Sequence, residues 1–352
     1  MPWDGRECYP RRTFLRLAGY GGLTLLGASL WPRRGWAAVD PAAVSRMEIE
    51  VCYRTEVKGL PRDATRLHLW MPLPPTSPSQ EVHDLTVRSS LPYEMREEAL
   101  FHNRMVHVES GREPASFTVE ARYRVVRHRA AAEPVARAEA SAPRYLRLGG
   151  RMRLTPEIEA FARHAIGGAT DPTQVARRVY DALIDTLTYD KQIAGCGTGD
   201  TAWIMKSRRG KCSDYHALYA TILRGRGIPV RWEEGFPLPY PSAGAVAEGT
   251  LAGDCTGAHC WVSFFDPARG WVPVDVSEGD NHPELRDFFF GQLTANRFQI
   301  SEGRSITLSP AQGGEPLPEL AFAYVEADSI PLIYPANYEN FVQFRVVGME
   351  TA

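Results

Sequence analysis

Three residue types that together support nucleophilic catalysis follow one another in the second half of the 352-residue chain: Cys212, His259 and Asp275. Cys212 begins a stretch patterned as a helix, where unpaired backbone N–H groups and the positive end of the helix dipole favour the thiolate over the thiol. Lys211 and Arg209, which precede it, act in the same direction. A nucleophile, a base and a carboxylate that orients the base are the parts needed for acyl transfer. The spacing therefore predicts a cysteine-dependent site that acts on an amide.

A predicted β-hairpin sets the separation of His259 and Asp275. The turn Asp266–Gly270 has proline early and glycine late, and apolar runs typical of strands flank it on both sides. If Phe265 pairs with Trp271, His259 lies diagonally from Asp275 on one face of the hairpin, where side chains still meet. A slip of one residue would move Asp275 to the opposite face. The register is therefore a prediction that a structure can test.

The expected reaction passes through a thioester. The thiolate of Cys212 attacks the amide carbonyl, His259 transfers the proton to the leaving nitrogen, and Asp275 fixes the tautomer of the imidazole. The backbone N–H of Cys212 is a candidate donor to the oxyanion. Aromatic residues near these positions are further candidates for oxyanion donor or pocket wall, although such side chains commonly belong to a core: Tyr189, Trp203 and Trp261.

The local patterns predict the elements that must position these residues. Residues 46–57 alternate strictly between apolar and charged side chains, and 117–125 repeat the pattern, as half-buried strands do. Helix-capping sequences begin at Thr155 and Asp171, each followed by a proline. The helix that starts at Cys212 should end near Gly225.

These patterns divide the chain into an α+β protein of two domains. Residues 40–130 are typical of a small antiparallel β-sandwich. Residues 131–150, rich in Ala, Pro and Arg, form the candidate linker. Residues 151–308 place helices before antiparallel strands, as in an α+β domain. The tail 309–352 is aromatic and apolar, and we expect it to pack back as one or two short strands.

Residues 1–38 have the features of an export signal. Arg11 and Arg12 form a twin-arginine sequence, an apolar run follows at 17–31, and small residues at Ala37 and Ala38 provide a cleavage site. The apolar run is shorter than the roughly 20 residues that a bilayer span needs. We therefore expect a cleaved twin-arginine signal and a folded protein in the bacterial periplasm or medium, rather than a permanent membrane anchor.

The net charge of the chain limits the classes of molecule that it is expected to bind. Without residues 1–38 the chain carries 34 basic and 40 acidic residues, a net charge of −6, and has no basic block. This balance argues against nucleic acids and against anionic membranes as partners.

Five cysteines remain after residues 1–38 are removed, an odd number that is typical of one free thiol and up to two disulfides. We assign the free thiol to Cys212; the others, whose pairing stays open, are Cys52, Cys196, Cys255 and Cys260.

A cluster of Cys255, His259 and Cys260, with Cys196 added, offers zinc ligands as an alternative. Its spacing differs from that of common zinc fingers, and an exported protein favours disulfides over zinc thiolates. We therefore expect no metal and no cofactor. The glycine-rich stretch 195–199 lacks the Lys-Ser/Thr ending of a phosphate-binding loop, so we expect a flexible loop beside the site.

Three blocks in the correct order resemble the bacterial transglutaminase-like superfamily. The first is Ser-Arg-Arg-Gly-Lys-Cys-Ser-Asp at 207–214, continued by Leu-Arg-Gly-Arg-Gly-Ile-Pro-Val-Arg at 223–231. The second and third are His-Cys-Trp-Val at 259–262 and Gly-Trp-Val-Pro-Val-Asp at 270–275. The resemblance covers roughly residues 155–300, the size of one domain. It implies a papain-like α+β fold in which the cysteine, histidine and aspartate named above form the triad. It also implies the β domain that often precedes this module in exported bacterial members.

The sequence departs from the family at two positions, because His216 and Cys260 stand where small apolar residues are usual. The pocket wall is therefore expected to differ. The sequence shows no calcium-site pattern resembling that of animal transglutaminases, so cross-linking activity does not follow. We predict an amide hydrolase or acyltransferase that acts on peptides or proteins. The alternatives are an enzyme that cross-links Gln and Lys side chains, and a non-catalytic binding or assembly module that retains the fold.

Overall fold

The computed structural model describes residues 40–61, 63–111, 116–135, 143–240 and 251–352; the predicted export signal lies outside them. None of the helices in these ranges has the length and apolar character needed to cross a bilayer. The helical elements are η1 (Pro41–Ala43), η2 (Pro143–Tyr145), α3 (Pro156–Ile166), α4 (Pro172–Thr186), α5 (Thr201–Ser207), α6 (Cys212–Gly225), α8 (Val276–Asn281) and η3 (Pro283–Leu285). The strands are β1 (Val44–Val57), β2 (Arg66–Pro72), β3 (Gln80–Ser89), β4 (Glu94–Glu97), β5 (Arg104–Gly111), β6 (Phe117–His128), β7 (Thr188–Tyr189), β8 (Arg209–Gly210), β9 (Val230–Pro237), β10 (Ala252–Asp254), β11 (His259–Asp266), β12 (Gly270–Val274), β13 (Arg297–Glu302), β14 (Tyr324–Ala327), β15 (Ile330–Pro331) and β16 (Tyr338–Thr351).

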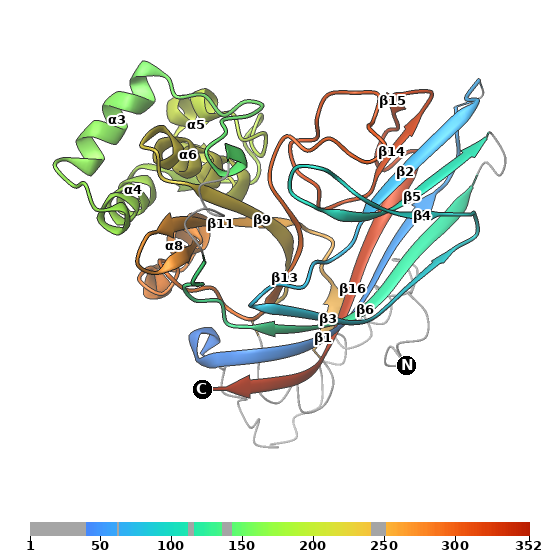
Figure 1. Cartoon of the computed structure of the whole chain (residues 1–352), viewed down its shortest axis with the longest axis horizontal. Helices are drawn as coiled ribbons and strands as arrows, with labels where there is room; N and C mark the ends of the chain where they lie inside the picture. Colours follow the sequence, from blue (N-terminus) through green and yellow to red (C-terminus); the bar gives the residue numbers. More distant parts are fainter. Residues whose placement is uncertain (1–39, 62, 112–115, 136–142, 241–250) are drawn as a thin grey trace, which may run out of the picture.

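Two five-stranded antiparallel sheets form the β domain (Figure 1), in the orders β10-β16-β1-β6-β3 and β15-β14-β2-β5-β4. The apolar side chains of β1 that alternate in the sequence, such as Met47 and Ile49, are fully buried. They share one core with Leu67 and Leu69 of β2 and Val108 of β5. Burial of this face explains the period of two, because successive side chains of a strand point to opposite sides. The predicted N-terminal β domain is confirmed.

The tail completes this domain from the other end of the chain. Strand β16 has 14 residues and pairs with β1 from Val57–Tyr338 to Val44–Thr351, between β10 and β1. The tail thus contains the expected short strands, β14 and β15, together with one strand, β16, that is much longer than expected. Residues 340–344 are buried without interruption, so this segment lacks the alternation that marks a half-buried strand.

The second core lies between helices α3 to α6 and a four-stranded antiparallel sheet in the order β12-β11-β9-β13. Figure 1 shows these helices gathered on one side of β9 and β11. The predicted caps are present, because Thr155 accepts a hydrogen bond from the N–H of Ile158 at 3.3 Å and Asp171 from that of Gln174 at 2.9 Å. Helix α6 ends at Gly225, as expected.

The start of the predicted linker pairs with the edge of the four-stranded sheet. Glu133 and Trp271 exchange two backbone hydrogen bonds of 2.8 Å. Gly270, at φ 82°, permits this approach, because a Cβ there would lie 1.9 Å from the carbonyl oxygen of Glu133. The linker thus begins as a segment docked on the helical domain, and residues 136–142 lie outside the described ranges.

The hairpin of β11 and β12 has the predicted register, since Phe265 pairs with Trp271 and Val262 with Val274. The second strand ends at Val274, whereas the sequence predicts a strand over Trp271–Val276. Asp275 instead becomes the N-cap of α8, a short helix that the sequence patterns did not indicate. The difference follows from the carboxylate, which accepts the N–H of Glu278 at 3.0 Å and so stabilises a helix start.

Candidate active site

Cys212 is the first residue of α6, and its side chain is 6% exposed. The helix start is held by Asp214, which accepts the N–H of Lys211 at 3.0 Å. The same carboxylate accepts the N–H groups of Gly197 at 2.7 Å and Gly199 at 3.1 Å. The loop that we expected to be flexible is thus tied to the helix that carries the thiol. The N–H of Cys212 belongs to the first turn, whose amides have no acceptor within the helix.

His259 and Asp275 meet as the hairpin register requires. The His259 Nε2 atom lies 2.7 Å from Asp275 Oδ2, and both side chains are buried, at 7% and 0% exposure. The thiol of Cys212 is in hydrogen-bonding contact with the imidazole of His259. The structure therefore brings together all three residues that the sequence analysis proposed as a triad.

The Asp275 carboxylate is held by two further side chains and by the helix it caps. Arg297 Nη1 donates to Oδ2 at 2.7 Å, and Ser277 Oγ donates to Oδ1 at 3.1 Å. Burial by itself would raise the pKa of Asp275, but the charges of His259 and Arg297 outweigh it and hold the pKa well below its usual range. Arg297 is buried in turn, with its guanidinium 5.1 Å from the centre of the Trp261 ring. Sequence reasoning did not assign Arg297 a role, because it follows Asp275 by 22 residues and nothing in the spacing marks it.

The electrostatic environment favours an ion pair between nucleophile and base. The pKa of Cys212 lies well below its usual value, mainly because Cys260 donates a hydrogen bond to the thiolate. Burial acts in the opposite direction, whereas the hydrogen bond and charge of His259 lower the pKa further. Burial would lower the pKa of His259, but the charge and hydrogen bond of Asp275 raise it to about 10. A thiolate beside an imidazolium is therefore the expected state near neutral pH.

Comparison with known proteins supports this interpretation of the core, because residues 159–276 match the family model described as the transglutaminase-like superfamily. Residues 159–276 therefore form a transglutaminase-like core within this chain. An uncharacterized protein of Haemophilus influenzae is 24% identical over 212 residues, which are 53% of this chain and 58% of the relative. The uncharacterized protein YebA of Bacillus subtilis is 28% identical over 82 residues, 23% of this chain and 11% of YebA. The chain thus spans little more than half of the first relative and about a tenth of the second.

Two solved structures are similar in outline. A candidate cysteine protease from Cytophaga hutchinsonii is 15% identical, with 86% of this chain and 98% of that chain covered and a TM-score of 0.49. The periplasmic domain of TgpA from Pseudomonas aeruginosa, bound to ethylmercury, is 19% identical, with 69% and 94% covered and a TM-score of 0.38.

The two departures from the family pattern, His216 and Cys260, lie directly behind the nucleophile of this transglutaminase-like core. The N–H of Val276 donates to His216 Nε2 at 3.0 Å, which leaves the proton of a singly protonated ring on Nδ1. That Nδ1 lies 3.5 Å from Cys260 Sγ, and the Cys260 thiol is in hydrogen-bonding contact with Cys212. Both side chains are buried. Cys260 also lines the cleft, in agreement with the expected change in the pocket wall, and its thiol is a donor to the thiolate of Cys212.

Replacing Cys260 with alanine is expected to raise the pKa of Cys212, because the thiolate loses its largest stabilising hydrogen bond. The pH profile of Cys212 alkylation by iodoacetamide, followed by mass spectrometry of the modified peptide, should shift toward higher pH. Cys255→Ala is the matched control, since that buried thiol lies in the core of the β domain. An unchanged profile in Cys260→Ala would show that the second thiol does not act on the first.

The three aromatic candidates occupy different places. Tyr189 lines the cleft beside Cys212, as the sequence analysis allowed. Trp203 and Trp261 are not among the described residues that line it. Trp203 lies against Gly195, where a Cβ would be 3.1 Å from its Nε1, and Trp261 is fully buried under Arg297. Both side chains pack within the protein, so the structure adds no support to the oxyanion or pocket role predicted for them.

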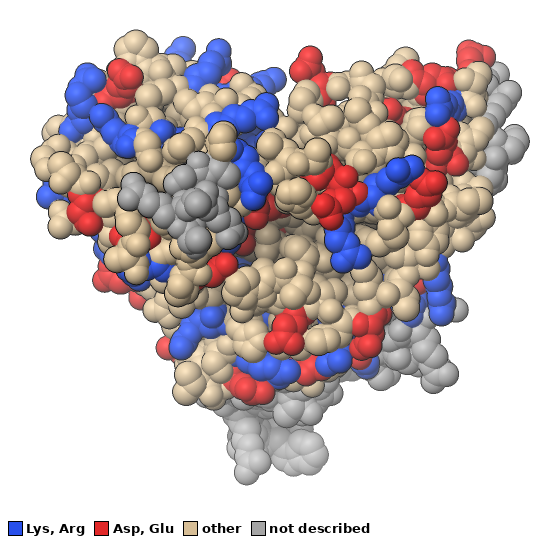
Figure 2. All heavy atoms as spheres, in the orientation of Figure 1, with Lys and Arg blue, Asp and Glu red and all other residues tan. Residues whose placement is uncertain are grey.

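The cleft has a volume of about 760 Å³ and opens above the thiol. One wall comes from the starts of α6 and β11, and the other from the tail segment 317–340. Figure 2 shows a notch between the helical part of the molecule and the part that holds β14. The side chains that the tail contributes are aromatic and apolar, with one acid: Leu317, Glu319, Phe322, Tyr324, Tyr334 and Tyr338. A segment that the sequence left without a function thus forms half of the candidate substrate site.

Cys52 is disulfide-bonded, whereas the other four described cysteines are not. Cys196, Cys212, Cys255 and Cys260 are all free, so no disulfide joins any two of them. The alternative zinc cluster is not assembled in the described part of the chain either. Cys255 packs in the core of the β domain and Cys260 packs in the core of the helical domain, so the two thiols lie in different cores.

Proposed function

We propose that this protein is an exported cysteine-dependent amide hydrolase or acyltransferase that acts on peptides or proteins through Cys212, His259 and Asp275. The observation that carries the proposal is the buried contact of 2.7 Å between His259 and Asp275, with the thiol of Cys212 in contact with the same imidazole. The membership of the core in the transglutaminase-like superfamily supports the reaction class.

In the proposed mechanism the Cys212 thiolate forms a bond to the carbonyl carbon of the substrate amide. The developing oxyanion lies near the free N–H at the start of α6, where helix-terminal amides stabilise negative charge. The His259 imidazolium then donates its proton to the leaving nitrogen, and the C–N bond breaks to release an amine and leave a thioester. The neutral imidazole accepts a proton from water, whose oxygen displaces the thiolate and releases the acid.

The cleft favours an extended peptide or a protein side chain as substrate, because it is lined by both domains and is rich in aromatic residues. Hydrolysis is the favoured outcome since water is always available to resolve the thioester. Transfer to an amine, as in cross-linking of Gln to Lys, uses the same intermediate. We propose that residues 1–38 direct the protein through the twin-arginine route to the periplasm or medium, and that neither nucleic acid nor a membrane is its partner.

The pH profile of thiol alkylation tests the proposal. We expect iodoacetamide to modify Cys212 rapidly down to acidic pH, because its low pKa leaves it ionised where an ordinary thiol, with a pKa of about 8.5, is protonated. In His259→Ala the pH at which the alkylation rate of Cys212 rises should move toward neutral or alkaline values. Cys196, half-buried and outside the cleft lining, provides an internal reference thiol. Slow modification of Cys212 at acidic pH would instead favour a non-catalytic binding module.

A second assay distinguishes hydrolysis from transfer. The purified chain is incubated with a glutamine-containing protein such as casein and a fluorescent primary amine. Under the hydrolysis proposal we expect ammonia release without fluorescence in the protein band, and neither product with Cys212→Ala. Incorporation of the amine would reject hydrolysis as the main outcome and support a cross-linking transferase.

A further inference from the structure

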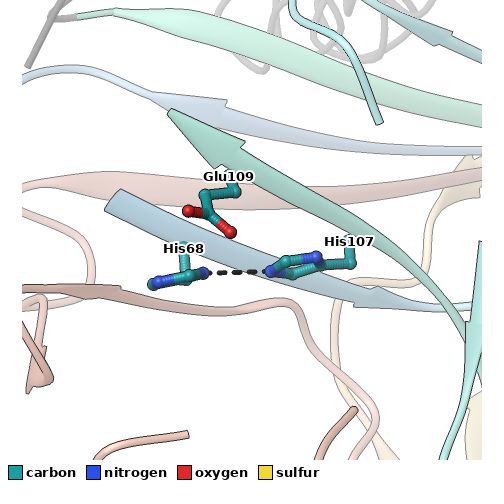
Figure 3. A group of neighbouring side chains, drawn as sticks. All are labelled: His68, His107 and Glu109. Atoms are coloured by element: carbon teal, nitrogen blue, oxygen red, sulfur yellow. Dashed lines mark hydrogen bonds between the residues drawn. The ribbon is translucent and has the colours of Figure 1, made fainter. Parts of the chain in front are cut away.

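The outer face of the second sheet of the β domain carries a cluster of three side chains with metal-ligating atoms: His68, His107 and Glu109. The antiparallel register places them on one face, because His68 of β2 pairs with Glu109 of β5 and Trp70 pairs with His107. His68 Nδ1 lies 3.0 Å from His107 Nε2, and the ligand atoms of all three residues lie within 4.8 Å of one another. Figure 3 shows the two imidazoles meeting edge to edge with the carboxylate of Glu109 above them.

We propose that His68, His107 and Glu109 bind a divalent transition-metal ion, with Zn²⁺ as the best match, and that water completes the coordination. Two imidazole nitrogens and a carboxylate oxygen are ligands that Zn²⁺ prefers. With Zn–N bonds of about 2.0–2.1 Å and tetrahedral angles, the two nitrogens would stand about 3.4 Å apart. The present separation of 3.0 Å needs to widen by only a few tenths of an ångström. The ion would replace the hydrogen bond that now joins the two rings.

The surroundings hold the ligands in place. Arg66 directs both of its hydrogen bonds to Oε1 of Glu109, so that Oε2 is left for an ion. The Trp70 ring packs against both imidazoles, with ring centres 5.3 Å from His68 and 5.2 Å from His107. These contacts restrict the rotation of the ligands, which lowers the entropy lost when an ion binds.

The cluster is open to solvent, and three acidic and two arginine side chains line its hollow. It lines a hollow of about 700 Å³ that is separate from the cleft at Cys212. Glu94 pairs across the strands with His107, and Glu326 with His68, so two more carboxylates flank the ligands on the same face. His107 is buried while Glu109 is exposed, so an ion can enter from the carboxylate side. The sequence analysis did not single out these ligands, because His68 and His107 lie 39 residues apart on two strands and form no local motif.

Binding of Co²⁺ and Zn²⁺ to the full chain tests the proposal. The background variant is Cys212→Ser, because the thiolate of the cleft would itself bind these ions. We expect one Zn²⁺ per chain by equilibrium dialysis and metal analysis. Co²⁺ should show visible d–d bands without the near-ultraviolet charge-transfer band of a Co–thiolate bond, as expected for nitrogen and oxygen ligands. Absence of a bound ion, or a thiolate band with Cys212 removed, would overturn the proposal.

Variants in the same background locate the ion. His68→Ala and Glu109→Gln are expected to weaken Zn²⁺ binding by a factor of about 10²–10³ and about 10–10² respectively, since each removes one ligand. His102→Ala, an exposed histidine of the same domain paired with Glu97, should bind as the background does. Both ligand variants replace residues that are not fully buried, and unfolding in EDTA checks that their fold is kept. Undiminished binding in both would place the ion elsewhere and reject the site.

Discussion

Replacing His259 with alanine is expected to lower kcat/KM for amide hydrolysis by a factor of about 10³–10⁴. The imidazole of His259 contacts both the Cys212 thiol and Asp275, and general acid–base catalysis contributes about 10²–10⁴ in rate. The loss should be at the upper end of that range, because the variant also raises the pKa of the nucleophile. The measurement is the hydrolysis of a fluorogenic peptide amide chosen from a library by turnover with the wild-type chain.

His282 provides the matched control for this variant. It is partly exposed beside Glu278 near the cleft, and it lies outside the triad. His282→Ala should therefore keep kcat/KM within about a factor of two, as exposed residues away from the chemistry usually do. Added imidazole should restore part of the activity of His259→Ala, because it can enter the vacated space and transfer the proton. Retention of more than a tenth of the wild-type activity in His259→Ala would contradict the triad.

The pH dependence of hydrolysis also tests the assignment of Cys212 as nucleophile and His259 as acid. The acidic limb should lie well below the ordinary pKa of a thiol, because it reports protonation of Cys212. The alkaline limb should lie near pH 10, where His259 loses the proton that the leaving nitrogen needs. The broad plateau between them is the kinetic consequence of a thiolate–imidazolium pair.

Replacing Asp275 with alanine is expected to lower the free energy of unfolding by about 3–5 kcal/mol, in addition to abolishing activity. The carboxylate is fully buried, and its removal leaves the buried guanidinium of Arg297 without its partner at 2.7 Å. Helix α8 also loses its N-cap, which is worth about 1 kcal/mol. Urea unfolding followed by tryptophan fluorescence measures the loss.

The double variant Asp275→Ala with Arg297→Met separates this charge effect from simple loss of packing. Because removing both charges avoids an unpaired buried ion, the double variant should be less destabilised than the sum of the two single variants. Asp287→Ala is the control, since this exposed carboxylate pairs with Arg177 at the surface and its loss should lower the free energy of unfolding far less than Asp275→Ala does. Additive losses in the double variant would show that the Arg297–Asp275 contact is not the source of the destabilisation.

The stabilisation by Asp275 should also depend on pH in a defined direction. Its folded-state pKa is depressed, so the contribution is present above the unfolded-state pKa of about 3.9 and is lost as pH falls toward the folded value. The difference in unfolding free energy between wild type and Asp275→Ala should therefore shrink as pH falls below about 3.9.

The local patterns predicted the positions of elements well where one physical rule dominated. Alternation identified β1 and β6 because one face of each is buried, and the caps at Thr155 and Asp171 identified the starts of α3 and α4. The turn Asp266–Gly270 was sufficient to predict the register of the hairpin. The end of the second strand was misplaced, because the cap formed by Asp275 depends on its own tertiary contacts as much as on local sequence.

By itself the sequence determined the identity and order of the candidate reacting groups and the hairpin that sets His259 beside Asp275, since these depend on residue type and short-range geometry. Only the tertiary structure decided which residues surround them: Arg297 on the carboxylate, Cys260 behind the thiolate, and the tail as the facing wall of the cleft. These partners come from elements distant along the chain, and no local pattern records which distant surfaces will be packed together. The contact between His68 and His107 could not be predicted from the sequence either, because it depends on β2 and β5 being neighbours in one sheet.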